Sequence, residues 1–589
     1  MQASDQPQAM QAGEAIVGRT KLIHFFIILA LGVLGYLLGP SDLVRGDYQA
    51  RIEAHYQDTY LAAVLPFQLD AEEGDPQSVA TAVDGYTLVV EGQTGYRYAF
   101  DQRISYRAQL QDGQGQPVVL EFDQLSSTIL GEDYAQVLPP TENQGDWMLF
   151  SMRTPYLTKV VTSLLLVVAG LWLTELVPLA AAALLIPVVA SVAGVANESL
   201  VYQSFFHPIV VLFFAGFLLA EGMRRTGVDR VIALIILRYA SSKPVFLMLT
   251  MMSVTAFFSL WMSNTASVAL MVPIALAVLK RLPEEGAHTG FNRALILGVA
   301  YAATVGGIGS AIGTPANILA LDFLNEFAGA EISFAGWFAY GLPVLFIMVP
   351  VIWLYLVLSF GVGLKQISDN LPREVYDVEL AGLGPMTARQ KLLLIVFASV
   401  IGLWLTESYH QIDTSIVALA GVLVLFFTET IKQADLGRLN WNALLTFGGG
   451  LAIGNLLLLT GFSDWVALKL VALSEVPVLL VVLVVVALAM VIGAFISNTA
   501  TAAMLIPLAI PLAHILHMDP RLLVCVIAIA SSLDFALVIG TPPTMMAYST
   551  GLFEVKDIFR RGIVLDVVST LLLSFGIIWI WKWLGVVSF

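Results

Sequence analysis

The sequence predicts an all-α polytopic membrane protein that carries one β-rich inserted domain. Of the 589 residues, 58% are hydrophobic and only 12% are charged, which is about half the charged share of a soluble domain. From residue 158 almost to the end, one hydrophobic segment follows another, as expected of membrane helices. The acidic charge gathers in residues 41–157, which hold 18 Asp and Glu against 6 Lys and Arg and so carry −12 of the net charge of −15.

The composition also excludes several classes of function. A net charge of −15 without a basic run argues against a nucleic-acid partner. The single cysteine, Cys525, excludes a disulfide framework, and the seven histidines lack metal-ligand spacing. No glycine-rich phosphate-binding motif is present, so an ATP-driven pump is unsupported. We therefore expect neither an enzyme nor a cofactor, apart from a coupling ion.

The first element is a hydrophobic span over residues 22–39, which contains no Asp, Glu, Lys or Arg. Arg19 and Lys21 precede it, and basic residues before a span place the N-terminus in the cytoplasm. A cleaved signal peptide is the alternative, but the exit of the span lacks a small-residue cleavage site. We read residues 1–40 as a cytoplasmic N-terminus and a retained transmembrane helix, in a bacterial inner membrane.

Residues 41–157 should then form an extracytoplasmic domain. It opens with a stretch at 42–65 that we expect to be helical, followed by alternating segments typical of strands. The domain has no catalytic motif, so we expect an accessory or dimer-contacting role, with a ligand sensor as the alternative. The predicted strands are 86–91, 96–100, 104–110 and 118–122, with turns at 92–95 and 112–115.

The remaining chain divides into two similar halves, 158–360 and 392–589, joined by a charged cytoplasmic linker at 361–391. Four motifs recur in the same order. We predict five spans per half, so the second half would be inverted in the membrane, as in many transporters. Segments 228–240 and 465–473 are too short to span and should lie on the surface. The repeated pairs include 170–175 with 402–407, 263–266 with 497–500, and 313–315 with 540–542.

The predicted topology sorts the basic residues by side. It places 19 of them in the cytoplasm. Beyond the inserted domain and Lys159, it leaves only Lys469, Arg521 and Lys582 outside. This bias is the one that membrane insertion follows.

Each half contains a Ser-Asn-Thr tripeptide inside hydrophobic sequence, at 263–265 and 497–499. The flanking segments are short for two full spans, so we predict two re-entrant hairpins with these residues at the tips. Ser and Asn favour helix starts, whose free N–H groups attract anions. Asn and Ser oxygens suit a hard cation such as sodium. Polar helix packing is the alternative, and the recurrence in register disfavours it.

Each half also contains a Gly-Thr-Pro segment, within 306–317 and 531–544. Gly and Pro interrupt a helix, which frees carbonyl groups for a cation and a Thr hydroxyl for substrate. A simple kink is the alternative, which the pairing with the hairpins disfavours. The second segment contains Asp534, which is either a cation or proton site or a capping residue near the segment end.

At these motifs the sequence resembles the divalent-anion/sodium symporter (DASS) family of sodium-coupled carriers for dicarboxylates, citrate and sulfate. The resemblance covers about 158–589 and leaves out the inserted domain. It implies an elevator carrier, usually a dimer. It places a first sodium at Ser259, Ser263, Asn264 and Gly313, and a second at Gly493, Ile496 (through its carbonyl), Asn498 and Gly540. It places substrate carboxylates at Ser263, Asn264, Thr265, Thr314, Ser497, Asn498, Thr499, Thr541 and Pro542.

The second half departs from the pattern at three residues: Gly493 stands at the place of Ser259, Thr544 stands at the place of Asn317, and Asp534 adds a carboxylate to the second broken segment. The resemblance nevertheless leads us to expect a sodium-coupled symporter of small divalent anions, dicarboxylates such as succinate. It should act as a homodimer in the lipid bilayer. A sulfate carrier or a sodium-independent anion exchanger is the alternative within the same class. A membrane receptor that senses through residues 41–157 is the alternative from another class.

The predicted topology can be tested with accessibility tags. A tag within 41–157 should react with an impermeant reagent on intact cells, because this domain should be extracytoplasmic. A tag within 366–388 should react only after permeabilisation. Reaction of both tags from the same side would contradict the inverted repeat.

Overall fold

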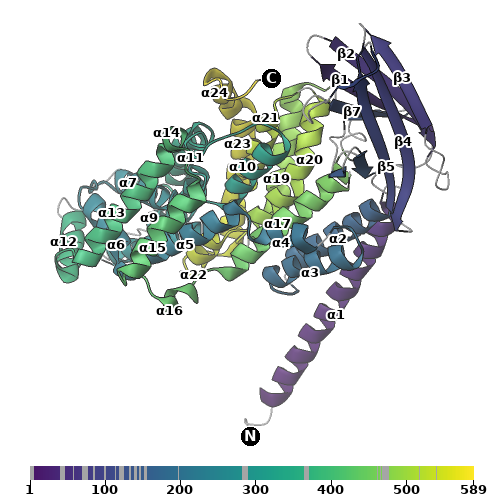
Figure 1. The fold of residues 1–589 in the computed structure, drawn as a ribbon. Helices are drawn as coiled ribbons and strands as arrows, with labels where there is room; N and C mark the ends of the chain where they lie inside the picture. The colour runs from purple at the N-terminus through teal and green to yellow at the C-terminus, as the bar shows by residue number, and fades with distance from the viewer. Residues whose placement is uncertain are drawn as a thin grey trace.

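The computed structural model describes residues 6–39, 47–56, 59–68, 77–83, 86–98, 101–112, 114–118, 125–131, 134–137, 142–144, 147–151, 155–174, 176–196, 198–280, 289–363, 371–460, 462–463, 466, 476–516, 518–538 and 540–588. A helical body carries a separate β domain at one end (Figure 1). Eight described helices are long and apolar enough to cross a membrane. The predicted class, an all-α polytopic membrane protein, is confirmed.

Helix α1 (Gln6–Leu38) and helix α2 (Pro155–Thr174) pack side by side and connect the β domain to the helical body (Figure 1). Two glycines make this contact close: Gly35 within α1, and Gly39, which follows the last residue of the helix. A Cβ on Gly35 would lie 3.0 Å from Cα of Ser163, and one on Gly39 would lie 2.9 Å from Cα of Lys159. Small residues permit such close helix packing in membranes. The helix extends well before the predicted span of 22–39.

The β domain consists of two antiparallel sheets. One sheet has the strand order β2-β1-β7-β8, and the other has β3-β4-β5-β10-β9 with β6 paired to β5. The strands are β1 (Asp47–Tyr56), β2 (Thr59–Gln68), β3 (Gln77–Val83), β4 (Tyr86–Tyr98), β5 (Asp101–Gln111), β6 (Pro117–Val118), β7 (Leu125–Gly131), β8 (Tyr134–Val137), β9 (Glu142–Gln144) and β10 (Trp147–Ser151).

Two predictions for this domain are wrong. The stretch 42–65 is not helical where it is described, because β1 and β2 form a hairpin with Asp47 opposite Gln68. Strand β1 also pairs with β7, and this distant partner overrides the local helix preference. The predicted turn at 92–95 lies inside β4, whose Gly92 and Gly95 pair with β5.

The second predicted turn, at 112–115, is confirmed. Gly115 has a φ of +75°, which glycine adopts without strain. The Asp112 side chain accepts hydrogen bonds of 2.9 Å from the amides of Gln114 and Gln116, a typical Asp-stabilised turn. Residues 99–100 and 119–122 of the predicted strands lie outside the described residues.

The helices of the two halves are given below in chain order. Several of them, α5, α7, α10, α21 and α22, begin with proline, whose missing N–H costs nothing at a helix start. The first half contains α2, α3 (Leu179–Val192), α4 (Glu198–Phe205), α5 (Pro208–Thr226), α6 (Val228–Leu237), α7 (Pro244–Ser259), α8 (Asn264–Leu279), α9 (Thr289–Ile308), α10 (Pro315–Phe327) and α11 (Phe338–Ser359). The second half contains α13 (Ala388–Leu405), α14 (Glu407–His410), α15 (Thr414–Phe427), α16 (Gln433–Leu436), α17 (Trp441–Leu459), α19 (Val478–Phe495), α20 (Asn498–Ile515), α21 (Pro520–Ala530), α22 (Pro542–Ser549), α23 (Val555–Leu572), a π-helical turn η4 (Leu573–Ile577) and α24 (Ile578–Trp583).

The first repeated motif has the same local structure in both halves. Trp172 and Trp404 are 2% and 1% exposed. Each indole N–H donates to the carbonyl of the first residue of the next long helix, Leu179 in α3 and Thr414 in α15. At this motif, therefore, the two halves repeat a side-chain contact as well as a sequence. The inversion of the second half across the membrane stays a prediction.

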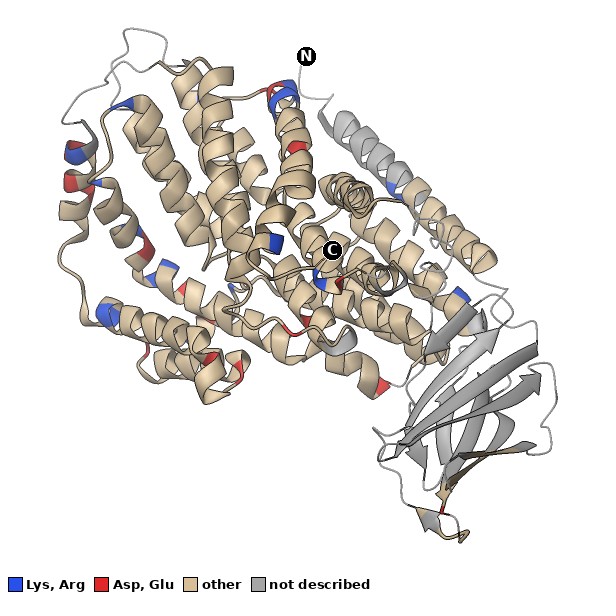
Figure 2. Ribbon diagram, turned by 90° about the horizontal axis from the view of Figure 1, so that it is seen from above, with Lys and Arg blue, Asp and Glu red and all other residues tan. Residues whose placement is uncertain are grey.

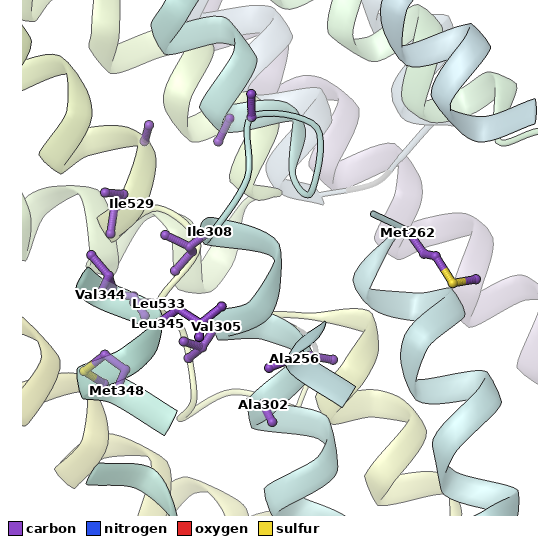
Figure 3. Packing of buried hydrophobic residues seen from close by; sticks show 14 of the residues in the cluster. Ala256, Met262, Ala302, Val305, Ile308, Val344, Leu345, Met348, Ile529 and Leu533 are labelled. Atoms are coloured by element: carbon purple, nitrogen blue, oxygen red, sulfur yellow. The ribbon is translucent and has the colours of Figure 1, made fainter. Parts of the chain in front are cut away.

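The two halves interlock through equivalent helices. Helix α3 packs on α17, and its counterpart α15 packs on α5. Helix α10 packs on α20 and α21, while its counterpart α22 packs on α8 and α9. Where α9 and the end of α21 meet α11, the buried side chains of Ile308, Val344 and Leu533 lie together (Figure 3). Each half therefore completes the core of the other.

The linker between the halves contains helix α12 (Leu371–Leu383), which binds to α6 of the first half. Arg238 Nε lies 2.8 Å from Asp377 Oδ1, and Arg230 pairs with Glu379. Helix α6 is the segment predicted to lie on the membrane surface. Its predicted counterpart at 465–473 lies outside the described residues except for Val466. Most of the helical ribbon carries no charged residue (Figure 2).

The packing of α23 against the break before α22 can be tested at Gly562. An added Cβ would lie 2.0 Å from the carbonyl oxygen of Phe535. We expect Gly562→Ala to destabilise the fold by about 1–3 kcal/mol, measured as a lower melting temperature in detergent. Gly216→Ala is the matched control, because its Cβ would meet nothing within 4 Å. Equal melting of the two variants would contradict this packing.

Candidate functional site: two hairpin tips and two broken helices

The first Ser-Asn-Thr tripeptide lies at a turn between two helices, as predicted. Helix α7 ends at Ser259, and helix α8 begins at Asn264 with Ser263 as its N-cap. The Ser263 hydroxyl accepts a hydrogen bond of 3.2 Å from the amide of Ala266. This cap fixes the start of α8 and leaves Asn264 at the turn.

The second tripeptide has the same arrangement. Helix α19 ends at Phe495, and helix α20 begins at Asn498. Between them, Ile496 has extended backbone (φ −121°, ψ 158°), and the Ser497 hydroxyl accepts from the amide of Ala500 at 3.3 Å. Helix α19 is long enough by length and composition to cross a membrane. That the two hairpins turn back within the bilayer therefore stays a prediction.

The first hairpin tip meets the break between α9 and α10 at a cluster of oxygens. The Ser259 hydroxyl lies 2.8 Å from Asn264 Oδ1 and 2.7 Å from the carbonyl of Ala303. The single hydroxyl proton of Ser259 can point to only one of these two oxygens at a time. A Cβ on Gly307 would lie 2.3 Å from Asn264 Oδ1 and 3.1 Å from the Gly313 carbonyl. The structure thus brings Ser259, Asn264 and Gly313 together.

Asn317 holds the broken backbone of this first junction. It is fully buried, and its Nδ2 lies 3.0 Å from the carbonyl of Gly307, 3.2 Å from Ile308 and 2.7 Å from Ser310. The Trp337 indole also donates to the Ile308 carbonyl at 2.9 Å. These donors satisfy carbonyls that the helix break leaves free. Asn317 Oδ1 has no hydrogen-bond partner among the described residues.

The second hairpin tip meets the break between α21 and α22 in the matching place. A Cβ on Gly493, the counterpart of Ser259, would lie 2.9 Å from the Ser531 carbonyl. No hydroxyl fits between the two backbones there. A Cβ on Gly540 would lie 1.5 Å from Asp534 Oδ2 and 3.3 Å from the Ala494 carbonyl. The second junction is thus built from backbone carbonyls and one carboxylate.

Different side chains hold the second break. Thr544 occupies the place of Asn317, but its hydroxyl bonds to the Thr541 hydroxyl at 2.9 Å. The Phe535 carbonyl instead accepts from the Tyr301 hydroxyl at 2.8 Å, and the Phe535 amide donates to Asp566 Oδ1 at 2.9 Å. Sequence reasoning missed Tyr301 and Asp566 as supports of the site. An acidic residue inside the apolar helix α23 was the available signal for Asp566.

The residues expected to bind substrate differ in exposure. Thr314 and Thr541 are 3% and 2% exposed, and both have extended backbone at a helix start. Thr265 and Pro542 are exposed. The remaining five, Ser263, Asn264, Ser497, Asn498 and Thr499, are half-buried. The hairpin tips therefore lie at the edge of the packed core, where a ligand can reach them.

Both junctions suit a hard cation beside an anion. Their polar groups are amide, hydroxyl, carbonyl and carboxylate oxygens, the donors that sodium prefers. Helices α8 and α10 begin at the first junction, and α20 and α22 begin at the second. A helix N-terminus favours negative charge. Segments 259–265, 306–317, 493–499 and 531–544 contain no Lys or Arg.

Comparison with known proteins shows which family the chain belongs to. Residues 152–587 match the family model described as "Sodium:sulfate symporter transmembrane region". The chain belongs to this family. The match confirms the predicted resemblance and the expectation of a transporter rather than an enzyme. Helix α1 and the strands of the β domain lie before the matched region.

Two sequence relatives carry names that agree with the family. The chain is 31% identical over 434 residues to the sodium-dependent dicarboxylate transporter SdcS of Staphylococcus saprophyticus, covering 69% of this chain and 83% of that protein. It is 29% identical to SdcS of Staphylococcus aureus, over 71% of this chain and 85% of that protein. The solved YdaH transporter of Alcanivorax borkumensis is 15% identical with a TM-score of 0.44, covering 65% of this chain and 87% of that one.

The role of Asn317 can be tested with an isosteric variant. Asn317→Asp keeps the shape but replaces the Nδ2 donor with an oxygen facing three carbonyls. Because unsatisfied buried groups cost about 1–3 kcal/mol each, we expect a clearly lower melting temperature and loss of sodium-stimulated uptake. Thr544→Val at the matched place should lower the melting temperature less, because Thr544 bonds to one hydroxyl. Wild-type stability of Asn317→Asp would show that these carbonyls need no donor.

Proposed function

We propose that this protein is a sodium-coupled symporter of small dicarboxylates such as succinate. The observation that carries the proposal is the pair of hairpin–break junctions, each lined by oxygens and each at the start of two helices. The relatives named as sodium-dependent dicarboxylate transporters support the same cation and the same class of anion. The sodium ligands and the substrate residues are those expected from the sequence.

The charge of the site supports coupling between the two ligands. A dianion at membrane depth needs positive charge nearby. The tips and breaks supply no Lys or Arg, and a helix N-terminus supplies only about half a charge. Bound sodium is the remaining source. Binding of the anion should therefore require sodium and, by reciprocity, tighten it.

We also propose an elevator movement in which α7–α10 and α19–α22 move as one body. The reciprocal packing of α10 on α20 and of α22 on α8 supports this, because it ties both junctions together. The homodimer and the extracytoplasmic placement of residues 41–157 complete the proposal. The assigned segments are the N-terminal 1–40, the inserted domain 41–157, the halves 158–360 and 392–589, and the linker 361–391.

The proposal is tested by radiolabelled succinate uptake into proteoliposomes, with sodium or choline outside. We expect uptake in sodium and background in choline. Asn264→Ala and Asn498→Ala should each reduce uptake to background without loss of folding, because each removes an oxygen at a hairpin tip. Gly216→Ala is the control for handling of variants, since its Cβ would meet nothing within 4 Å.

Other outcomes would favour the alternatives. Uptake of sulfate but not succinate would indicate a sulfate carrier. Equal succinate uptake in sodium and choline would indicate a sodium-independent exchanger. Succinate binding to residues 41–157, with no uptake by the full chain, would indicate a receptor. Near-normal uptake by both Asn variants would indicate that the Ser-Asn-Thr tripeptides serve only helix packing.

A further inference from the structure

The two junctions differ at one position that the repeat aligns. The offset of 227 residues that pairs Gly313 with Gly540 also pairs Gly307 with Asp534. In the first half the Asn264 side chain occupies the place of a side chain here, because a Cβ on Gly307 would lie 2.3 Å from Asn264 Oδ1. In the second half the same position carries a carboxylate. The two junctions therefore place different side-chain oxygens beside the helix break.

The geometry of the first half shows where a side chain at this position points. From Gly307 it would point into the space between the hairpin-tip Asn264 and the Gly313 carbonyl, where the first sodium is proposed to bind. Asp534 points toward Gly540, the counterpart of Gly313, since its Oδ2 lies 1.5 Å from the position of a Cβ on Gly540. The Ala494 carbonyl of the second hairpin borders the same place.

The Asp534 carboxylate is buried and has no cationic partner among the described residues. The residue is 2% exposed; the backbone amides of Ala536 and Leu537 lie near its carboxylate, but neither oxygen accepts a hydrogen bond of full geometry in the described part of the chain. An unpaired buried carboxylate is costly unless a proton or a cation accompanies it. Buried ionisable groups inside a membrane protein are usually functional for this reason.

The charged groups around the second break do not compensate Asp534. Asp566 is also acidic, and its Oδ1 accepts from the Phe535 amide. Arg561 is engaged elsewhere, with its Cζ 4.0 Å from the Phe360 ring centroid and its Nη1 3.6 Å from Asp557 Oδ1. Tyr301 donates its hydroxyl to the Phe535 carbonyl. Among the described residues no basic side chain supplies positive charge to Asp534, so a bound cation or a proton must do so.

We propose that the Asp534 carboxylate is an anionic ligand of a sodium ion bound between the second hairpin tip and its broken helix. This inference rests on the proposed sodium coupling and adds a ligand type that the first junction lacks. It gives the second site a fixed negative charge, so this site should bind sodium more tightly than the first. It also compensates for Gly493, which offers no hydroxyl where Ser259 does in the first half.

Sodium binding to the purified full-length chain tests this assignment without transport. Radioactive sodium would be titrated by scintillation proximity, and the melting temperature would be followed against sodium concentration. We expect Asp534→Asn to raise the half-saturating sodium concentration roughly tenfold or more, because ligand charge sets the affinity of a hard cation. Asp534→Gly, which matches Gly307, should do the same and serves if the first variant folds poorly.

Glu554→Gln is the matched control. It removes a carboxylate that lies outside both junctions, where Glu554 is exposed and pairs with Lys556 at 2.7 Å. We expect its half-saturating sodium concentration to stay within about twofold of wild type, since an exposed ion pair contributes little to a distant site. An equal rise in both variants would indicate a general charge effect and overturn ligation by Asp534.

The two proposals fail in different ways. If wild type binds sodium and folded Asp534→Asn binds it with unchanged affinity, Asp534 is not a ligand, although sodium coupling stands. If wild-type binding and melting do not respond to sodium at all, sodium coupling itself fails. A rise in the half-saturating sodium concentration confined to the Asp534 variants supports the assignment.

Discussion

The structure depends on satisfying the backbone where two helices break inside an apolar body. Carbonyls and amides released there cannot turn to water, so other groups must bond to them. In the first half Asn317 and Trp337 supply the donors. In the second half Tyr301 and Asp566 satisfy the Phe535 carbonyl and amide. The oxygens beside the hairpin tips are those that these donors do not reach, and they line the candidate site.

The same constraint explains why the two halves are inseparable. Each second arm of a broken helix packs on the hairpin of the other half, α10 on α20 and α22 on α8. Tyr301 of the first half even bonds to the break of the second. Direct packing therefore connects the two junctions. The proposed elevator movement, in which both sites move together, would require such a connection.

The repeat is close but not complete, and its differences are chemical. Ser259 and Asn264 give the first junction hydroxyl and amide oxygens. Gly493 brings the second hairpin against the Ser531 carbonyl, and the second half carries the Asp534 carboxylate at the position of Gly307. Thr544 cannot replace Asn317, because its single hydroxyl is used by Thr541. The two proposed cation sites therefore differ in charge, although they occupy matching places in the repeat.

The sequence by itself determined the membrane helices, the hairpin turns at Ser263 and Ser497, and the breaks at the Gly-Thr-Pro segments. These follow from local chemistry: apolar runs, N-capping side chains, and the backbone limits of Gly and Pro. It misjudged 42–65, because strand β1 is fixed by distant partners rather than by local preference. Only the tertiary structure decided which oxygens converge and where the Asp534 carboxylate points. Those contacts join residues far apart in the chain, such as Tyr301 and Phe535, so no local pattern could specify them.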